Sequence, residues 1–346
     1  MQTFTEKPSV QSLVNSGLET EMAIDLVKST FSSALTQNLN LLRVTAPIVV
    51  EANTGINDDL NGVERAISFP IPDIQNATGV VVQSLAKWKR IRLHQLRMGA
   101  GQGIITDMRA LRPDEKLSPI HSIYVDQWDW EKVISSTQRS IEYLKEVVEN
   151  IYKSILQTEQ IVCQKYSQIK PILPSTITFI LAQQLLDRYP TLSAKERENL
   201  IAKEFGAVFI IGIGGKLKNG EPHDGRAPDY DDWSTPNDMG YQGLNGDIIV
   251  WNPVLESAFE ISSMGIRVDK TAMQRQLQIC GCEDRAKLLF HAKLLAGELP
   301  NSIGGGIGQS RLCMFLLRKN HIGEVQASIW PNHTRLAYGA QGIEIV

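Results

Sequence analysis

Near the C-terminus, a run of glycines is followed closely by an arginine. The segment reads Gly304-Gly305-Gly306-Ile307-Gly308-Gln309-Ser310-Arg311. Because glycine has no Cβ, such a backbone can lie flat against a planar ligand, and the guanidinium of Arg311 can hold phosphate oxygens. The segment lacks the Gly-Lys-Ser/Thr ending of a P-loop and the spacing of a dinucleotide fingerprint. We therefore predict a phosphate-binding site at Gly306, Gly308 and Arg311, with a glycine-rich surface turn as the alternative.

Two further arginines could act together with Arg311. Arg112 lies in Ala110-Leu111-Arg112-Pro113-Asp114-Glu115, and Arg226 lies in Asp224-Gly225-Arg226-Ala227-Pro228. An arbitrary arginine is most often a solvated surface charge. Arg311 is less easily read in that way, because an arginine directly after a glycine cradle has little reason to be there without an anion.

Two carboxylates stand inside apolar stretches that are typical of strands. Asp247 lies in Gly246-Asp247-Ile248-Ile249-Val250, and Glu260 lies in Phe259-Glu260-Ile261-Ser262-Ser263. Acids in such places are costly unless they are paired or bind a cation, and Mg²⁺ favours a few carboxylates together with ligand phosphates. A buried salt bridge to one of the arginines is the alternative. The acidic run from Asp229 to Asp232 is of the kind that usually forms a loop facing water.

The segment from His121 to Trp130 reads as a strand with two different faces. Gln127 and Asp129 would share one face, and Trp128 and Trp130 the other. An amide and a carboxylate placed two residues apart on one strand face suit a shared ligand.

The surrounding elements predict an α+β fold, in which helices pack on an antiparallel sheet. We expect a helix over 21–38, an extended stretch over 41–50 broken by Pro47, and a long helix beginning near Ile141. Ser193-Ala194-Lys195-Glu196 has the form of a capping box, and Gly206 ends the helix that it opens. Strands are predicted over 207–213, 248–251 and 258–268. The predicted organisation is an N-terminal extension over 1–20 and a single catalytic domain over 21–346.

Composition limits the classes of function. The chain has 346 residues, 42% hydrophobic and 21% charged, which is ordinary for a soluble globular protein. A net charge of −3 gives no electrostatic case for nucleic acid. No apolar run approaches the ~20 residues that cross a bilayer, so we expect no membrane partner. The four cysteines lack zinc-ligand spacing, so reduced thiols and a cytoplasmic location are expected.

Three of these segments resemble, in order, the three signatures of class II aminoacyl-tRNA synthetases. Leu42 to Pro47 is similar to the first signature, Leu111 to Glu115 to the second, and Gly304 to Arg311 to the third. The resemblance is closer to the ammonia-dependent asparagine synthetases of the A type, the aspartate–ammonia ligases, and it runs from about Ile24 to Pro331. It rests on the longer segments Ser84–Arg90, Leu117–Ser122, Val125–Trp130, Arg226–Trp233, Gly243–Asp247 and Phe259–Arg267. The sequence departs from the family in the N-terminal extension, in residues 332–346, and at Asn40, where glycine is expected.

This resemblance implies a homodimer that joins L-aspartate and ammonia at the expense of ATP. The implied products are asparagine, AMP and pyrophosphate, formed through a β-aspartyl adenylate with the help of Mg²⁺. The implied ATP-binding residues are Arg112, Arg226, Glu260, Gly306, Gly308 and Arg311. The implied metal-binding residues are Asp247, Glu260 and Ser263, and the implied aspartate-binding residues are Ser84, Lys89, Gln127, Asp129 and Asp231.

The same resemblance implies a catalytic set of Arg112, Arg311, Lys89 and Asp58. Lys89 would hold the α-carboxylate of aspartate, and Gln127 with Asp129 would hold its ammonium group. Asp58 would attract ammonium near the reacting end and accept a proton.

Three other functions compete with this interpretation. An aspartyl- or asparaginyl-tRNA synthetase would need a second module for tRNA, and the acidic charge balance argues against one. A glutamine-dependent synthetase usually carries an N-terminal nucleophilic cysteine, whereas no cysteine precedes Cys163. A non-catalytic paralogue would be expected to lose the signature arginines and acids, which are all present here. The choice of ammonia or glutamine as the nitrogen donor stays open.

Overall fold

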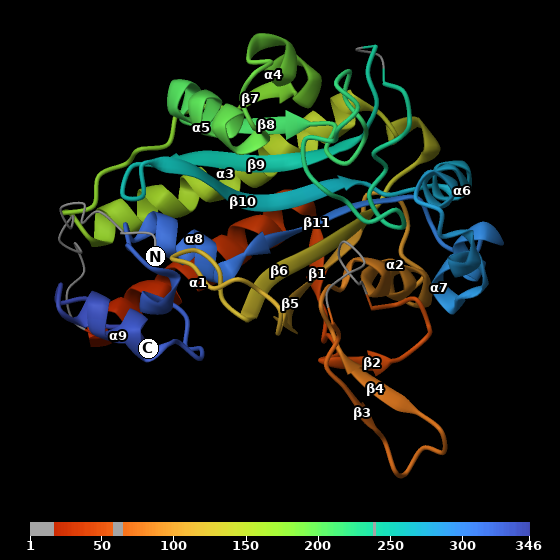
Figure 1. The fold of residues 1–346 in the computed structure, drawn as a ribbon, viewed down its shortest axis with the longest axis horizontal. Coiled ribbons are helices and arrows are strands. Elements are labelled where there is room, and N and C mark those ends of the chain that lie inside the picture. The colour runs from red at the N-terminus through yellow and green to blue at the C-terminus, as the bar shows by residue number, and fades with distance from the viewer. Residues whose placement is uncertain (1–16, 58–64, 238–239) are drawn as a thin grey trace.

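The computed structural model describes residues 17–57, 65–237 and 240–346, which form a large sheet, a small sheet and the helices around them (Figure 1). The large sheet has the strand order β1 (Leu41–Arg43), β5 (Gly103–Leu111), β6 (Tyr124–Val133), β11 (Ser302–Gly308), β10 (Ser257–Ile266), β9 (Asn245–Asn252), β8 (Ala207–Ile211) and β7 (Thr178–Leu181). The small sheet has the order β2 (Val49–Glu51), β4 (Thr78–Val81) and β3 (Ser68–Pro70).

The helices and 3₁₀ turns of the described residues are distributed along the whole chain. The helices are α1 (Gly17–Leu39), α2 (Ala86–Gln95), α3 (Ile141–Lys165), α4 (Ala182–Arg188), α5 (Ala194–Phe205), α6 (Lys270–Ile279), α7 (Leu289–Leu295), α8 (Gln309–Leu316) and α9 (Asn332–Gly339). The 3₁₀ turns are η1 (Ser136–Gln138), η2 (Glu283–Lys287) and η3 (Ile322–Glu324). None of the helices in the described ranges has the length and apolar character needed to span a membrane.

The large sheet is antiparallel in its middle and parallel at both edges. Neighbouring strands from β5 to β8 run antiparallel, which confirms the predicted α+β arrangement. The edge strands β1 and β7 differ, because β1 pairs in parallel with β5 and β7 in parallel with β8. Parallel neighbours need a crossover connection, and the chain supplies one in each case: the small sheet with α2, and the pair α4 and α5.

One face of the large sheet is covered by α1 and α3, which lie behind it in Figure 1. The predicted steps of three and four residues on α3 are confirmed, since Ile141, Leu144, Val148, Ile151 and Ile155 are all buried in the main core. On β6 the predicted division of faces is also confirmed. Trp128 and Trp130 belong to this core, and the ring of Trp128 lies 4.6 Å from that of Phe31 on α1.

In the described part of the chain, a helix packs at each end of the opposite face of the sheet. At one end α2 packs on β5, β6 and β11, and at the other end α5 packs on β8, β9 and β10. Figure 1 shows these two helices far apart. The middle of the face, where β6, β11 and β10 run side by side, therefore lies between two helices and carries the polar side chains described below.

Most of the predicted elements are confirmed, with shifted boundaries. The predicted helix over 21–38 is α1, and the chain does break at Pro47, since β1 and β2 belong to different sheets. The capping box is present, because Ser193 Oγ accepts from the Glu196 amide and Glu196 accepts from the Ser193 amide. Gly206 ends the helix with a φ of 75°. The division into an extension over 1–20 and one domain stays a prediction, since residues 1–16 lie outside the described part of the chain.

The glycine-rich segment is a central strand, so the alternative of a surface turn is wrong. Gly304, Gly306 and Gly308 of β11 lie directly opposite Glu131, Asp129 and Gln127 of β6. A Cβ on Gly304 would collide with the Glu131 carboxylate, and one on Gly306 would collide with the Gln127 amide. The glycines therefore make room for three polar side chains of the neighbouring strand.

Candidate functional site

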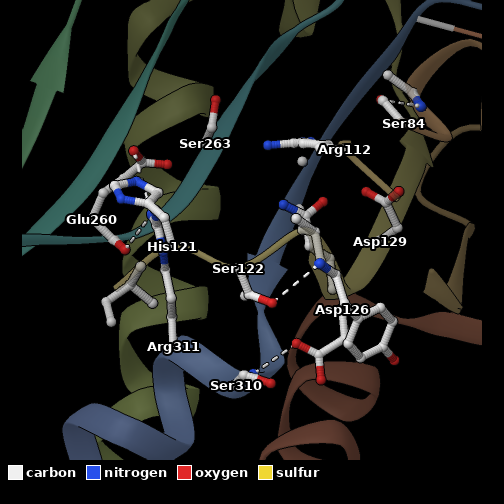
Figure 2. Close-up of a pocket in the computed structure, with 18 of the residues that line it drawn as sticks. Ser84, Arg112, His121, Ser122, Asp126, Asp129, Glu260, Ser263, Ser310 and Arg311 are labelled. Carbon is white, nitrogen blue, oxygen red and sulfur yellow. Dashed lines mark hydrogen bonds and ion pairs between the residues drawn. The ribbon is translucent and has the colours of Figure 1, made fainter. Parts of the chain in front are cut away.

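A cavity of about 330 Å³ lies on the open middle of the sheet face, and we call it the central cavity (Figure 2). The predicted site residues that line it are Ser84, Lys89, Arg112, Gln127, Asp129, Arg226, Asp231, Glu260, Ser263, Gly306, Gly308 and Arg311. Asp247 is not among the lining residues, and Asp58 lies outside the described residues. Arg112, Arg311 and Glu260 thus share one cavity, although they are separated by up to two hundred positions.

At one end of the central cavity, Lys89 and Asp129 form a buried ion pair. Lys89 Nζ donates to Asp129 Oδ1 at 2.6 Å and to the Gly305 carbonyl at 3.0 Å. An ammonium group has three donors, so one remains for a ligand. Asp129 Oδ2 is buried and has no hydrogen-bond partner among the described residues, which leaves an acceptor for a ligand donor. Burial lowers the pKa of Lys89, although the charges of Asp129 and Glu131 oppose that effect.

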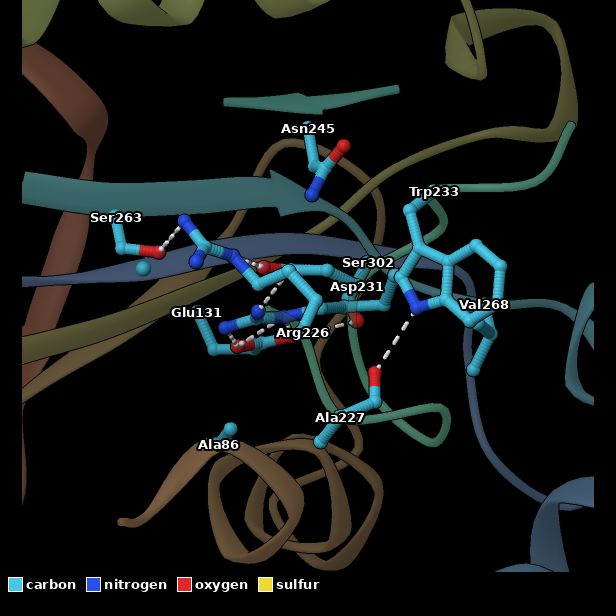
Figure 3. A network of polar contacts seen from close by, with 12 residues as sticks. Ala86, Glu131, Arg226, Ala227, Asp231, Trp233, Asn245, Ser263, Val268 and Ser302 are labelled. Carbon is cyan, nitrogen blue, oxygen red and sulfur yellow. Dashed lines mark hydrogen bonds and ion pairs between the residues drawn. The ribbon is translucent and has the colours of Figure 1, made fainter. Parts of the chain in front are cut away.

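Beneath this pair, Glu131, Arg267 and Asp231 form a buried network (Figure 3). Arg267 donates to both oxygens of Glu131, with the shortest N–O distance at 2.8 Å, and Nη1 donates to Asp231 at 2.5 Å. Ser302 adds a further bond to Glu131 at 2.7 Å. Burial raises the pKa of Asp231, and Arg267 opposes this shift without cancelling it. Removing one member would leave an uncompensated buried charge, so the network fixes the floor of the cavity.

Arg226 connects this network to Asp247. Its Nη2 donates to Asp247 and to Ser263 Oγ, the latter at 2.9 Å, and its Nε lies 4.0 Å from Asp231. The salt bridge that the sequence left as an alternative for Asp247 is therefore present. Burial raises the pKa of Asp247 to about 7, and the nearby charge of Glu260 adds to that effect against the influence of Arg226.

Two further guanidinium groups of the central cavity, those of Arg112 and Arg311, make few hydrogen bonds to the described residues. Arg112 has a single hydrogen bond at the limit of length, 3.5 Å to the Gln83 carbonyl, and its buried Nε has no partner among the described residues. Arg311 Nη1 donates to the Glu260 carbonyl at 3.2 Å and lies 3.6 Å from the Glu260 carboxylate. Figure 2 shows both side chains along the same cavity. Together with Arg226 they form a positive surface suited to a polyphosphate.

A bulge in β10 explains how Glu260 and Ser263 come to line one cavity. The pairing of β10 with β9 shifts register between Glu260 and Ser262. Side chains two residues apart normally share one face of a strand. A β-bulge inserts one extra residue, so side chains three residues apart share a face across it. No cluster of three or more His, Cys, Asp or Glu side chains with metal-ligand geometry occurs in the described part of the chain. The carboxylate of Glu260 and the hydroxyl of Ser263 still fit Mg²⁺, which takes few protein oxygens and completes its shell with phosphates and water.

A family model of aspartate-ammonia ligase matches residues 18–342 of the chain. The chain belongs to the aspartate–ammonia ligase family. It is 54% identical over 344 residues to an aspartate–ammonia ligase of Parabacteroides distasonis, a match that covers 99% of this chain and 100% of the relative. It is 56% identical over 312 residues to an aspartate–ammonia ligase of Clostridium perfringens strain SM101, covering 90% of each chain.

The fold of this family member is similar to that of class II synthetases of known structure. Asparaginyl-tRNA synthetase from Pyrococcus horikoshii, in complex with asparaginyl-adenylate, superposes with a TM-score of 0.67 at 16% identity, over 94% of this chain and 74% of that one. Aspartyl-tRNA synthetase from Entamoeba histolytica gives a TM-score of 0.58 at 13% identity, over 94% and 62% of the two chains. At these identities the likeness concerns the fold alone, and it confirms the predicted class II synthetase-like core.

The predicted site residues did not include His121 and Arg267, which line the cavity, or Glu131, which pairs with Arg267. Glu131 could have been found, because it continues the two-residue spacing of Gln127 and Asp129 on β6. Arg267 closes the family-like segment of β10 but carries no local signal. His121 was not among the predicted site residues, yet it lies beside Arg311 and Glu260 in Figure 2. Burial lowers the pKa of His121 to about 4, and the charge of Arg311 adds to the effect.

The interpretation of the acidic run as a loop facing water is wrong for this family member. Asp229, Asp231 and Asp232 are all buried. Each carboxylate is paired: Asp229 with Lys87, Asp231 with Arg267, and Asp232 with Arg139. An acidic run shows only that charge is concentrated, and whether it meets water depends on cations supplied by distant elements.

Proposed function

We propose that this protein converts L-aspartate, ammonia and ATP into L-asparagine, AMP and pyrophosphate through a β-aspartyl adenylate. Membership of the aspartate–ammonia ligase family supports the two substrates that join. The observation that carries the mechanism is the layout of the central cavity. The cavity contains a Lys89–Asp129 pair with one spare donor and one spare acceptor, together with the guanidinium groups of Arg112, Arg226 and Arg311.

The polar groups at the Lys89 end match the α-amino acid part of aspartate. The third proton of Lys89 is available to the α-carboxylate, and Asp129 Oδ2 is available to the α-ammonium group. Gln127 lies on the same strand face and Ser84 lines the same end, so both are further candidates for polar contacts with the substrate. Held in this way, aspartate would direct its β-carboxylate toward the guanidinium groups.

The arginines of the cavity match the negative charge that develops during adenylation. The β-carboxylate oxygen attacks the α-phosphorus of ATP, and the bond from that phosphorus to the pyrophosphate oxygen breaks. Arg112, Arg226 and Arg311 would neutralise the phosphate charge in this step. Each positioned cationic donor in a site shielded from water lowers the activation barrier by on the order of 3 kcal/mol.

Glu260 and Ser263 are the residues proposed to hold Mg²⁺, with Asp247 held behind them by Arg226. When bound, Mg²⁺ would supply additional positive charge to the phosphates. Asp58, the residue expected near the attacking nitrogen, stays a prediction because it lies outside the described residues. A cytoplasmic homodimer also belongs to the proposal, and the exposed apolar side chains of Leu42 and Ile48 beside Pro47 support a protein interface there.

A product assay tests the proposed function. Purified protein is incubated with Mg²⁺, ATP, aspartate and either ammonium chloride or glutamine, and the amino acid and nucleotide products are separated. We expect asparagine and AMP in equal amounts with ammonium. Formation of ADP would instead indicate an acyl-phosphate route, and the absence of asparagine with both donors would refute the proposal.

A further inference from the structure

A second polar cavity lies on the other side of the segment that carries Lys89, and we call it the second cavity. Its volume is about 310 Å³, and Gln83 and Lys87 are among its lining residues. Ser84 and Lys89, one or two positions further along, line the central cavity. The start of α2 and the residues just before it therefore line both cavities.

The second cavity contains a fully buried pair, Asp229 and His291. His291 Nε2 lies 2.9 Å from Asp229 Oδ2, and Lys87 Nζ lies 3.0 Å from the same oxygen. Arg285 approaches this oxygen as well, at 3.4 Å. All the contacts recorded for the carboxylate fall on Oδ2, since Oδ1 has no hydrogen-bond partner among the described residues. Lys87 and the bond from His291 hold the pKa of Asp229 below its usual range, even though burial acts in the opposite direction.

The same contact fixes which nitrogen of His291 carries a proton. An ionised carboxylate can only accept, so Nε2 must donate to Asp229. In the neutral ring Nδ1 then has a lone pair, and this atom is also buried with no partner among the described residues. Gly55 keeps it uncovered, because a Cβ at Gly55 would lie 2.8 Å from Nδ1.

Two buried acceptors without a donor are costly, and together they indicate the kind of ligand that would satisfy them. The charged residues that line the second cavity in the described ranges are Glu51, Asp229, Lys87 and Arg285, so their charges balance. The bare oxygen of Asp229 repels anions. A small ligand with several N–H donors and no acceptor fits such a site, and ammonium has that chemistry.

We propose that Asp229 and His291 bind an ammonium ion in the second cavity and remove one of its protons, supplying ammonia to the aspartyl adenylate. The inference rests on the proposed function and identifies where the nitrogen substrate enters it. The proton moves from nitrogen to His291 Nδ1, and Asp229 stabilises the resulting imidazolium through the bond to Nε2. Lys87 and Arg285 favour this loss of positive charge from the ligand.

The remaining steps balance without another reactant. The lone pair of ammonia attacks the β-carbonyl carbon of the adenylate, and the bond from this carbon to the AMP oxygen breaks. The attacking nitrogen loses one proton to solvent as the amide forms. His291 then releases to solvent the proton that it took from ammonium. Ammonium is the major form near neutral pH but has no lone pair, so an enzyme that accepts it needs a base.

The test replaces His291 by Gln and compares two nitrogen nucleophiles. The amide nitrogen of Gln can still donate to Asp229, but the side chain has no basic lone pair. We expect kcat/KM for ammonium to fall by about a hundredfold, the usual size of a general-base contribution. Hydroxylamine is largely unprotonated near neutral pH and needs no such base, so kcat/KM for hydroxylamine should stay within about twofold. Aspartate-dependent exchange of label between pyrophosphate and ATP needs no nitrogen nucleophile, so it should also stay within about twofold.

His223→Gln is a matched control, because His223 is also buried against a carboxylate, that of Glu198 at 3.2 Å, but lines neither of the two cavities. It should change none of the three activities. An unchanged kcat/KM for ammonium in His291→Gln, or an equal loss with ammonium and hydroxylamine, would overturn the inference. Absence of exchange in the unaltered protein would instead refute the proposed function.

A measurement on the unaltered protein decides the matter even if His291→Gln does not fold. Between about pH 7 and pH 8, kcat/KM for total ammonia should be nearly constant if the protein binds ammonium and deprotonates it. If only free ammonia reacts, the value should rise about tenfold over the same unit of pH. The second result would exclude the inference.

Discussion

At the scale of single residues, the central cavity is defined by donors and acceptors that the folded chain leaves unused. Arg112 Nε and Asp129 Oδ2 are buried atoms without partners among the described residues. Groups of this kind destabilise a protein unless a ligand or water satisfies them. Because both residues line the same cavity, they support a ligand that carries both cationic and anionic groups.

Arg112→Ala should therefore stop adenylation without unfolding the protein. The rate of aspartate-dependent pyrophosphate–ATP exchange is expected to fall by about a hundredfold, because a phosphate-facing cation is lost in a site shielded from water. The melting temperature should change little, since the side chain of Arg112 makes one weak hydrogen bond among the described residues. Arg188→Ala, which removes an exposed arginine paired with Glu204, is the control and should leave exchange intact. Exchange at the unaltered rate in Arg112→Ala would refute the assigned role.

His121 gives a prediction about pH. Its pKa in the folded protein is lowered to about 4, mainly by burial, so the unfolded chain takes up a proton first as pH falls. The lowered pKa of His121 therefore adds to the free energy of unfolding above about pH 6.5. This stabilisation is lost as the pH falls through about 4. Denaturant titrations at several pH values should show a shallower decline for His121→Gln than for the unaltered protein. Identical declines would contradict the assignment of a neutral buried ring.

At the scale of elements, the site depends on a match between two neighbouring strands. The polar residues of β6 project over the glycines of β11, and the bulge in β10 turns Glu260 and Ser263 toward the same cavity. Among the described residues, α2 and α5 pack at the two ends of this sheet face. The sheet therefore serves as a rigid floor from which adjacent strands present their side chains.

Gly306→Ala tests this match. A Cβ at this position would collide with the Gln127 amide and lie 3.1 Å from Asp129 Oδ1, so it would displace both side chains proposed to hold the ammonium group of aspartate. We expect KM for aspartate to rise by at least about tenfold. Gly339→Ala on α9 is the control, since no atom lies within 4 Å of a Cβ there. An unchanged KM for aspartate would show that the glycine is not needed for this purpose.

At the scale of the whole molecule, the open question is how many copies form the functional unit. Leu42 on the edge strand β1 is 56% exposed, and Ile48, directly before β2, is 59% exposed. Large apolar side chains that lie together on a surface mark interaction sites. A second copy of the chain is the partner proposed for this surface.

Ile48→Glu should weaken a homodimer, because it places a charge in an apolar interface. Sedimentation velocity is expected to show twice the chain mass for the unaltered protein and a shift toward the 38.5 kDa monomer for the variant. Leu200→Glu on α5, another exposed apolar position, should leave the assembly unchanged. A monomer in the unaltered protein at micromolar concentration would refute the dimer.

Local patterns in the sequence determined much of the secondary structure of this protein. The steps of three and four on α3, the two faces of β6 and the capping box of α5 are all read from residues a few positions apart, because helix and strand periods are local properties. The family-like segments likewise identified most of the residues that line the central cavity. These features specify which face of an element is apolar and which side chains it presents.

Only the tertiary structure decided how those side chains are paired. Asp247 is held by Arg226 instead of lining the cavity, the acidic run is buried, His121 lies beside Arg311, and His291 contacts an aspartate 62 positions away. Each pairing joins elements brought together by the order of strands in the sheet and by the helices packed on it. The residue spacing within a single helix or strand does not predict that order. The partner of a buried charge, and the chemical role of that charge, are therefore decided only when the chain has folded.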